Sequence, residues 1–72
     1  MREVEIRDDS IRLGQLLKLA DLVDQGSDAR ALVASGDVTV NGEVETRRGR
    51  QLRPGDTVSV GGETVGIRRA GH

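Results

Sequence analysis

The chain has 72 residues, a formal net charge of −1, and neither cysteine nor aromatic residues. This length predicts one small domain over residues 1–72, with a core of Leu, Val, Ile and Ala. The lack of cysteine excludes disulfides, iron–sulfur clusters and thiolate metal sites, and no apolar run approaches the roughly 18 residues of a membrane span. A net charge of −1 argues against nonspecific binding of nucleic acid. The distribution of charge along the chain is more informative than this sum.

The chain begins with residues that indicate a short strand and then a helix. Val4 and Ile6 alternate with charged residues, which is typical of an edge strand over residues 2–7. Ser10 is a good N-cap, and apolar side chains follow it at helical spacing up to a predicted end at Gly26. The apolar positions of this helix are Leu13, Leu16, Leu17, Leu19, Ala20, Leu22 and Val23.

A second helix is predicted directly after the first. Ser27 is its expected N-cap and Gly36 its end, and its inner face carries Ala29, Leu32 and Val33. The link between the two helices is only a few residues long, so we expect them to pack as neighbours.

From Val38 the period of the apolar residues changes from 3.6 to 2, which favours strands. Asn41-Gly42, between alternating valines, predicts a hairpin, because a type I′ turn needs a positive φ at both positions. Leu52 is the lone apolar residue of the segment after the hairpin, and we expect its buried side chain to anchor that segment to the core. The remaining turns are predicted at Pro54-Gly55-Asp56 and Gly61-Gly62, and the remaining strand residues are Val58, Val60, Val65 and Ile67.

Helices that are segregated from strands along the chain indicate an α+β fold. We therefore predict two short N-terminal helices packed on a small antiparallel sheet, with residues 70–72 as a frayed tail.

The sequence offers no catalytic, cofactor or metal site. His72 is the only histidine and ends the chain, and the serines have no histidine or cysteine partner for a nucleophilic pair. The glycines match neither the dinucleotide fingerprint nor the phosphate loop, and no metal-ligand spacing occurs. We expect a protein that is not an enzyme. Its acidic N-terminus is unlike a secretory or mitochondrial signal, which predicts a cytoplasmic location.

Arginines gather just after the hairpin. Arg47, Arg48, Arg50 and Arg53 fall within seven positions, with no acid among them. Such a run can be a solvated loop without a partner. A nearly all-arginine run beside a rigid hairpin instead favours phosphate binding, because the guanidinium group is a planar fork of five hydrogen-bond donors.

Basic residues on the helices are weaker candidates. Arg12 falls at the margin of the apolar face of the first helix, and Arg30 flanks the apolar face of the second helix. Lys18 points away from the apolar face of the first helix and is interpreted as ordinary solvated surface. The lack of aromatic side chains disfavours single-stranded targets, whose bases stack on such rings, and favours folded or double-stranded RNA.

The sequence from residue 11 to about residue 60 resembles the alpha-L RNA-binding domain, the S4-type domain of the small ribosomal subunit, and it is most similar to small stand-alone bacterial members. The matching positions are Arg12, Leu16, Leu17, Ser27, Ala29, Leu32, Val33, Gly36, Val38, Val40, Asn41, Gly42, Gly55 and Asp56. The resemblance implies a motif core over 11–60 and a module that binds structured RNA, often ribosomal or transfer RNA. It implies an RNA surface on the helix pair and the adjoining loop, at Arg12, Arg30 and the Arg47–Arg50 group.

Two other functions remain open from the sequence. A helix-turn-helix protein would read DNA from its second helix, where this chain offers only Arg30. A β-grasp sulfur carrier also shows Val-Asn-Gly and a Gly-Asp turn, but such carriers end on Gly-Gly, and here Gly61-Gly62 is internal.

Overall fold

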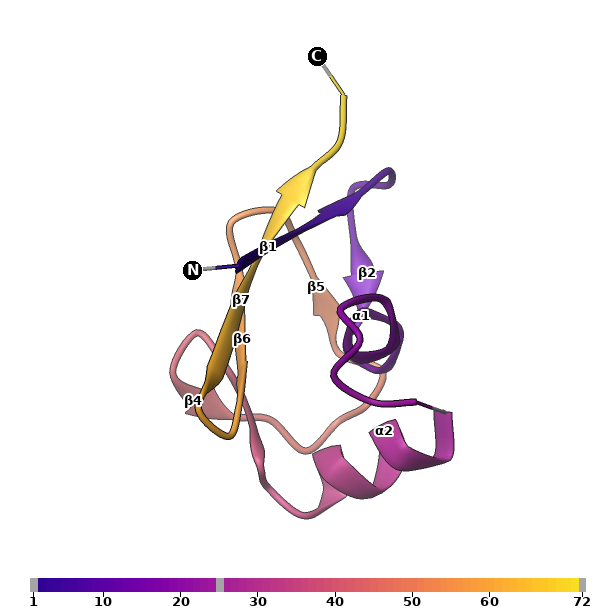
Figure 1. Cartoon of the computed structure of the whole chain (residues 1–72), viewed down its shortest axis with the longest axis vertical. Coiled ribbons are helices and arrows are strands. Elements are labelled where there is room, and N and C mark those ends of the chain that lie inside the picture. Colours follow the sequence, from indigo (N-terminus) through magenta and orange to yellow (C-terminus); the bar gives the residue numbers. More distant parts are fainter. Residues whose placement is uncertain (1, 25, 72) are drawn as a thin grey trace.

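The computed structural model describes residues 2–24 and 26–71, and Figure 1 shows a sheet on one side of the molecule and two short helices on the other. The main sheet has the strand order β1-β7-β6-β3-β4. Its strands are β1 (Arg2–Ile6), β3 (Val38–Val40), β4 (Glu43–Val44), β6 (Thr57–Val60) and β7 (Glu63–Arg69). A separate pair joins β2 (Ile11–Arg12) to β5 (Gln51–Leu52) beside the first helix.

The predicted α+β fold is confirmed in outline, but two parts of the prediction are wrong. Strands β1 and β2 precede the helices, and β1 pairs with β7 in parallel, so the sheet is mixed rather than antiparallel. The period-2 pattern identified the strand over residues 2–7 without identifying its partner. The parallel register places Val4 opposite Ile67, and both side chains enter the core.

The first helix, α1 (Leu13–Leu19), begins later than predicted, and Arg12 rather than Ser10 is its N-cap. Residues 11 and 12 are extended because they pair with β5, and Arg12 offers no capping side chain. The first amides of the helix donate instead to the segment around the arginines: Leu13 N–H to the Arg50 carbonyl at 2.8 Å, and Gly14 N–H to the Arg48 carbonyl at 3.0 Å. These contacts satisfy donors that a helix leaves open at its start.

The end of α1 also differs from the prediction, because Asp21 ends the helix well before Gly26. Asp21 has φ 62°, its amide donates to the Lys18 carbonyl, and the Leu22 amide donates to the Leu17 carbonyl. This is the Schellman arrangement. Leu19, the last residue of α1, is 54% exposed.

The second helix, α2 (Gly26–Ala34), packs against α1 and ends as predicted near Gly36, which has φ 83°. The predicted cap Ser27 falls at a position whose side chain lies outside the described part of the structure.

The hairpin prediction is confirmed, because Asn41 has φ 52° and Gly42 φ 87°. The structure adds a link between two distant turns. The Asn41 side chain donates to Asp56 Oδ1 at 3.1 Å and accepts from the Thr57 amide at 2.9 Å. The Val-Asn-Gly hairpin and the Gly-Asp turn are therefore joined through their polar residues.

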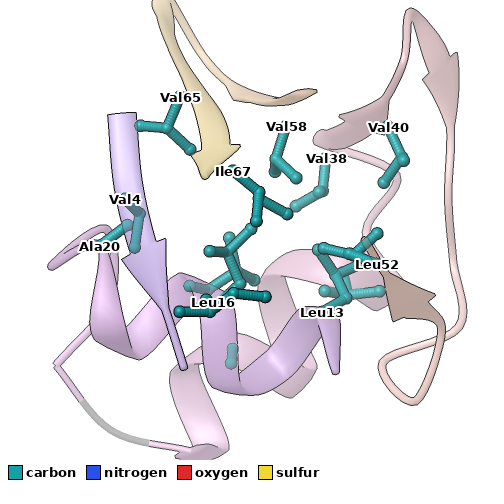
Figure 2. Close-up of a cluster of buried hydrophobic side chains, with 14 residues drawn as sticks. Val4, Leu13, Leu16, Ala20, Val38, Val40, Leu52, Val58, Val65 and Ile67 are labelled. Atoms are coloured by element: carbon teal, nitrogen blue, oxygen red, sulfur yellow. The ribbon is translucent and has the colours of Figure 1, made fainter. Parts of the chain in front are cut away.

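The core lies between the sheet and the helices, and Figure 2 shows side chains from both layers meeting there. Leu13, Leu16 and Leu17 of α1 are fully buried against the valines and isoleucines of the sheet. Leu52 is fully buried as predicted and holds β5 to this core. Backbone pairing reaches Ala70, whose amide donates to the Ile6 carbonyl at 2.7 Å, one residue into the segment expected to be frayed.

Candidate nucleic-acid interface

The arginine loop, residues 46–50, lies against the start of α1. The two backbone hydrogen bonds from Leu13 and Gly14 fix the loop to the helix, and an Arg50 N–H to Arg47 carbonyl bond of 3.2 Å closes a turn within it. The loop is therefore a docked element, and its arginines project from a defined backbone.

Glu45, just before the loop, binds two of its arginines. The Glu45 side chain is only 7% exposed, and its amide donates to the Val38 carbonyl, so the residue is held at the edge of the sheet. Its carboxylate accepts from Arg47 Nε at 3.1 Å, from the Arg47 amide at 3.0 Å and from Arg50 at 2.9 Å. The sequence interpretation stressed the lack of acids among the arginines and missed this acid, two positions before Arg47.

The contacts of Glu45 change the acidity of both partners. Hydrogen bonds from Arg47, and then from Arg50, lower the pKa of Glu45 from 4.5 to about 2. The same pairing raises the pKa of Arg47. The single charge of Glu45 therefore compensates one of the two positive charges of Arg47 and Arg50 within the protein.

Arg48 has no contact with Glu45 among the described hydrogen bonds and lines an open cavity of about 270 Å³, which we call the basic groove. The groove is lined by Arg12, Gly14, Gln15, Lys18, Ala29, Arg48 and Gly49. It collects three cationic side chains and no acidic one. Among the residues that the structure describes, these three cations form no ion pair with a carboxylate.

The groove brings together only part of the predicted set. Arg12 and Arg48 line it, whereas Arg47 and Arg50 bind Glu45. Arg30 is exposed on α2, directly after the groove residue Ala29. Arg53 is exposed outside the groove, where its amide donates to Asp56 at 2.8 Å.

Lys18 is the groove residue that the sequence interpretation set aside. It points away from the apolar face of α1, as predicted, but the groove lies on that exposed face. The spacing of Gly14 and Lys18, four positions apart, places both on one side of a helix and was the available signal.

The remaining paired arginines lie on the sheet. Arg2 pairs with Glu63 at 2.8 Å, Arg68 pairs with Glu5, and Arg69 pairs with Asp9 at 2.7 Å. The positive charges of these three arginines are thus offset by nearby acids.

The described residues hold no group of His, Asp or Glu side chains that could bind a metal ion. Within the same residues, none of the helices has the length and apolar character needed to cross a membrane.

Comparison with known proteins gives consistent matches. A family model described as "S4 domain" matches residues 4–68. The chain is 42% identical over 59 residues to the "Probable ribosome maturation protein RlbA" of Bacillus subtilis, covering 82% of this chain and 83% of that protein. It is 39% identical over 57 residues to the "Putative RNA-binding protein YbcJ" of Escherichia coli, covering 79% and 81%.

Solved structures agree with these relatives. The solution structure of E. coli YbcJ, described as revealing an αL motif involved in RNA-binding, matches with a TM-score of 0.73 and 33% identity over 94% of this chain and 87% of that one. The 30S ribosomal protein S4e of Thermoplasma acidophilum has a TM-score of 0.61 and 24% identity, covering 81% of this chain and 31% of that one, which shows a shared fold.

Proposed function

The chain belongs to the S4 domain family, and from this premise we propose that it is a non-enzymatic module that binds structured RNA through the basic groove. The observation that carries the proposal is the convergence of Arg12, Lys18 and Arg48 without an acidic partner, next to loop arginines, Arg47 and Arg50, that are paired with Glu45. Phosphate groups suit such a site, because each contact to a cation releases condensed counterions.

Structured RNA is favoured over single strands by the absence of aromatic side chains. The relatives support the same class of ligand, since one is named for RNA-binding and another for ribosome maturation. We therefore infer that ribosomal RNA is the first target to test, with transfer RNA as the second, and that the protein works in the cytoplasm. Arg30, beside the groove, is a candidate for a flanking contact, and Arg53 is a more distant one.

Neither alternative function is favoured. α2 presents Arg30 as its one cationic side chain, which is little for reading the major groove of DNA. The sulfur-carrier alternative rested on turn motifs, and here Asn41 and Asp56 of those motifs bind each other within the fold.

The test compares two charge-matched kinds of variant. Replacing Arg12, Lys18 and Arg48 with Gln should weaken binding to ribosomal RNA and reduce the slope of log K against log salt by roughly 2 to 3, at about 0.7 to 0.9 per phosphate contact. The control replaces Arg2, Arg68 and Arg69 with Gln, three arginines of the sheet that are paired with acids, and should lose much less.

The measurement is a binding titration with ribosomal RNA, transfer RNA and duplex DNA at several equal salt concentrations. Equal losses in the two variants would mean that binding follows net charge, and preferred binding of duplex DNA would contradict the proposal.

A further inference from the structure

Gly14 lies under the side chain of Arg48. A Cβ atom at position 14 would lie 2.7 Å from Arg48 Cγ and 3.1 Å from Cδ, closer than side chains tolerate. The arginine stem therefore crosses α1 where the helix has no side chain, and Arg48 lines the groove together with Arg12 and Lys18.

The backbone itself does not require glycine at this position. Gly14 is in the first turn of α1 and is not among the described residues with positive φ. Glycine is disfavoured relative to alanine in a helix, because it loses more conformational freedom on folding. The close approach of Arg48 is the feature that distinguishes the site.

We propose that Gly14 is a positioning residue for RNA binding: it seats the aliphatic stem of Arg48 so that the guanidinium group faces the groove. This inference rests on the proposed function, since it concerns the same groove and the phosphates of the same RNA. A guanidinium group that is held before binding has less freedom to lose when it meets a phosphate.

A Cβ atom at position 14 would collide with the side chain of Arg48 but not with its backbone. A Cβ at position 14 would be 3.7 Å from the Arg48 carbonyl oxygen, an ordinary contact, so the hydrogen bond from the Gly14 amide can remain. A methyl group at position 14 should thus displace the arginine side chain while the loop stays docked on α1.

The experiment measures the affinity for purified bacterial ribosomal RNA and the melting temperature of the full chain. The variants are Gly14→Ala, Arg48→Ala and the two combined, with Gly62→Ala as the matched control. Gly62 lies outside the groove, its added Cβ would meet nothing within 4 Å, and its φ is not positive.

Gly14→Ala should weaken binding by roughly five- to eightfold at about 0.1 M salt, the value for one lost phosphate contact, without lowering the melting temperature. Gly62→Ala should bind like the parent. Once Arg48 is Ala, no Cγ remains to collide, so adding Gly14→Ala should cause no further loss.

Two outcomes would overturn the inference even if the parent binds RNA. One is that Gly14→Ala binds RNA as tightly as the parent. The other is that Gly14→Ala weakens binding as much in the Arg48→Ala background as it does in the parent. If the parent does not bind RNA, the proposed function fails, and the inference fails with it.

Discussion

At the scale of single residues, Glu45 separates the arginines of the loop into two roles. Arg47 and Arg50 bind its buried carboxylate, whereas Arg48 lines the groove. A triple substitution of these arginines would therefore mix a structural effect with a binding effect. Variants that change only Arg48, or only Arg47 and Arg50, separate the two effects.

Replacing Arg47 and Arg50 with Gln should lower the melting temperature by several degrees, because it leaves the carboxylate of Glu45 without its charged donors. Arg48→Gln should leave the melting temperature close to that of the parent and weaken RNA binding. Thermal unfolding and RNA titration of both variants check this. A double variant as stable as the parent would show that the Glu45 contacts contribute little.

The lowered pKa of Glu45 predicts a pH dependence of stability. Above about pH 4.5 the carboxylate is ionised in both the folded and the unfolded protein, so its contribution is complete. As the pH falls toward about 2, the unfolded protein takes up the proton first, and the contribution is lost.

The parent should consequently lose stability more steeply than Glu45→Gln between about pH 4.5 and about pH 2, since a glutamine at position 45 binds no proton in this range. Urea unfolding of both proteins at several pH values across this window measures the difference. Parallel curves would contradict the assigned ion pairs.

At the scale of elements, the turns fix the positions of the strands and helices. The hairpin at Asn41-Gly42 requires positive φ, and the side chain of Asn41 ties it to the turn at Asp56. The end of α1 likewise depends on one left-handed residue, Asp21.

Gly42→Val should destabilise the protein by roughly 1 kcal/mol or more, because a β-branched residue rarely adopts positive φ. A Cβ at this position meets nothing within 4 Å, so the cost is conformational. Gly62→Val is the matched control, since position 62 is equally open but has no positive φ, and it should cost less. Chemical denaturation of the two variants decides between them.

Asp21→Gly should stabilise the protein by about 0.5 to 1 kcal/mol, because glycine adopts the left-handed conformation at a helix end without steric cost. The control is Asp24→Gly, an exposed aspartate that is not among the described residues with positive φ, where no gain is expected. A gain at both positions would point to an effect of charge rather than of conformation.

At the scale of the whole molecule, the recognisable motif is smaller than the unit that folds. Residues 11–60 carry the family resemblance, yet Val4, Ile6, Val65 and Ile67 of the core lie outside that range. β1 and β7 supply these residues, and their parallel pairing joins the two ends of the chain. We propose that residues 2–71 form one cooperative domain.

A fragment of residues 11–60 should therefore fail to fold cooperatively, because its remaining core would lose the cover of β1 and β7. The full chain should unfold in one transition with equal midpoints by circular dichroism and by amide NMR signals. A fragment with its own cooperative transition would show that the outer strands are accessory.

Much of the fold and part of the site could be predicted from the sequence, because they depend on local patterns. The hairpin at Asn41-Gly42, the helix end near Gly36 and the buried position of Leu52 follow from turn chemistry and apolar spacing. The resemblance to the S4-type domain rested on such local motifs, and the match over residues 4–68 confirmed it.

Only the tertiary structure decided which arginines lie together and which are paired. Arg12 and Arg48 come from separate elements and meet because the loop docks on the first amides of α1. The pairing of Glu45 and the parallel contact of β1 with β7 likewise depend on how distant segments pack. Local patterns give the period and the turns of a chain, but charge partners are set by contacts through space.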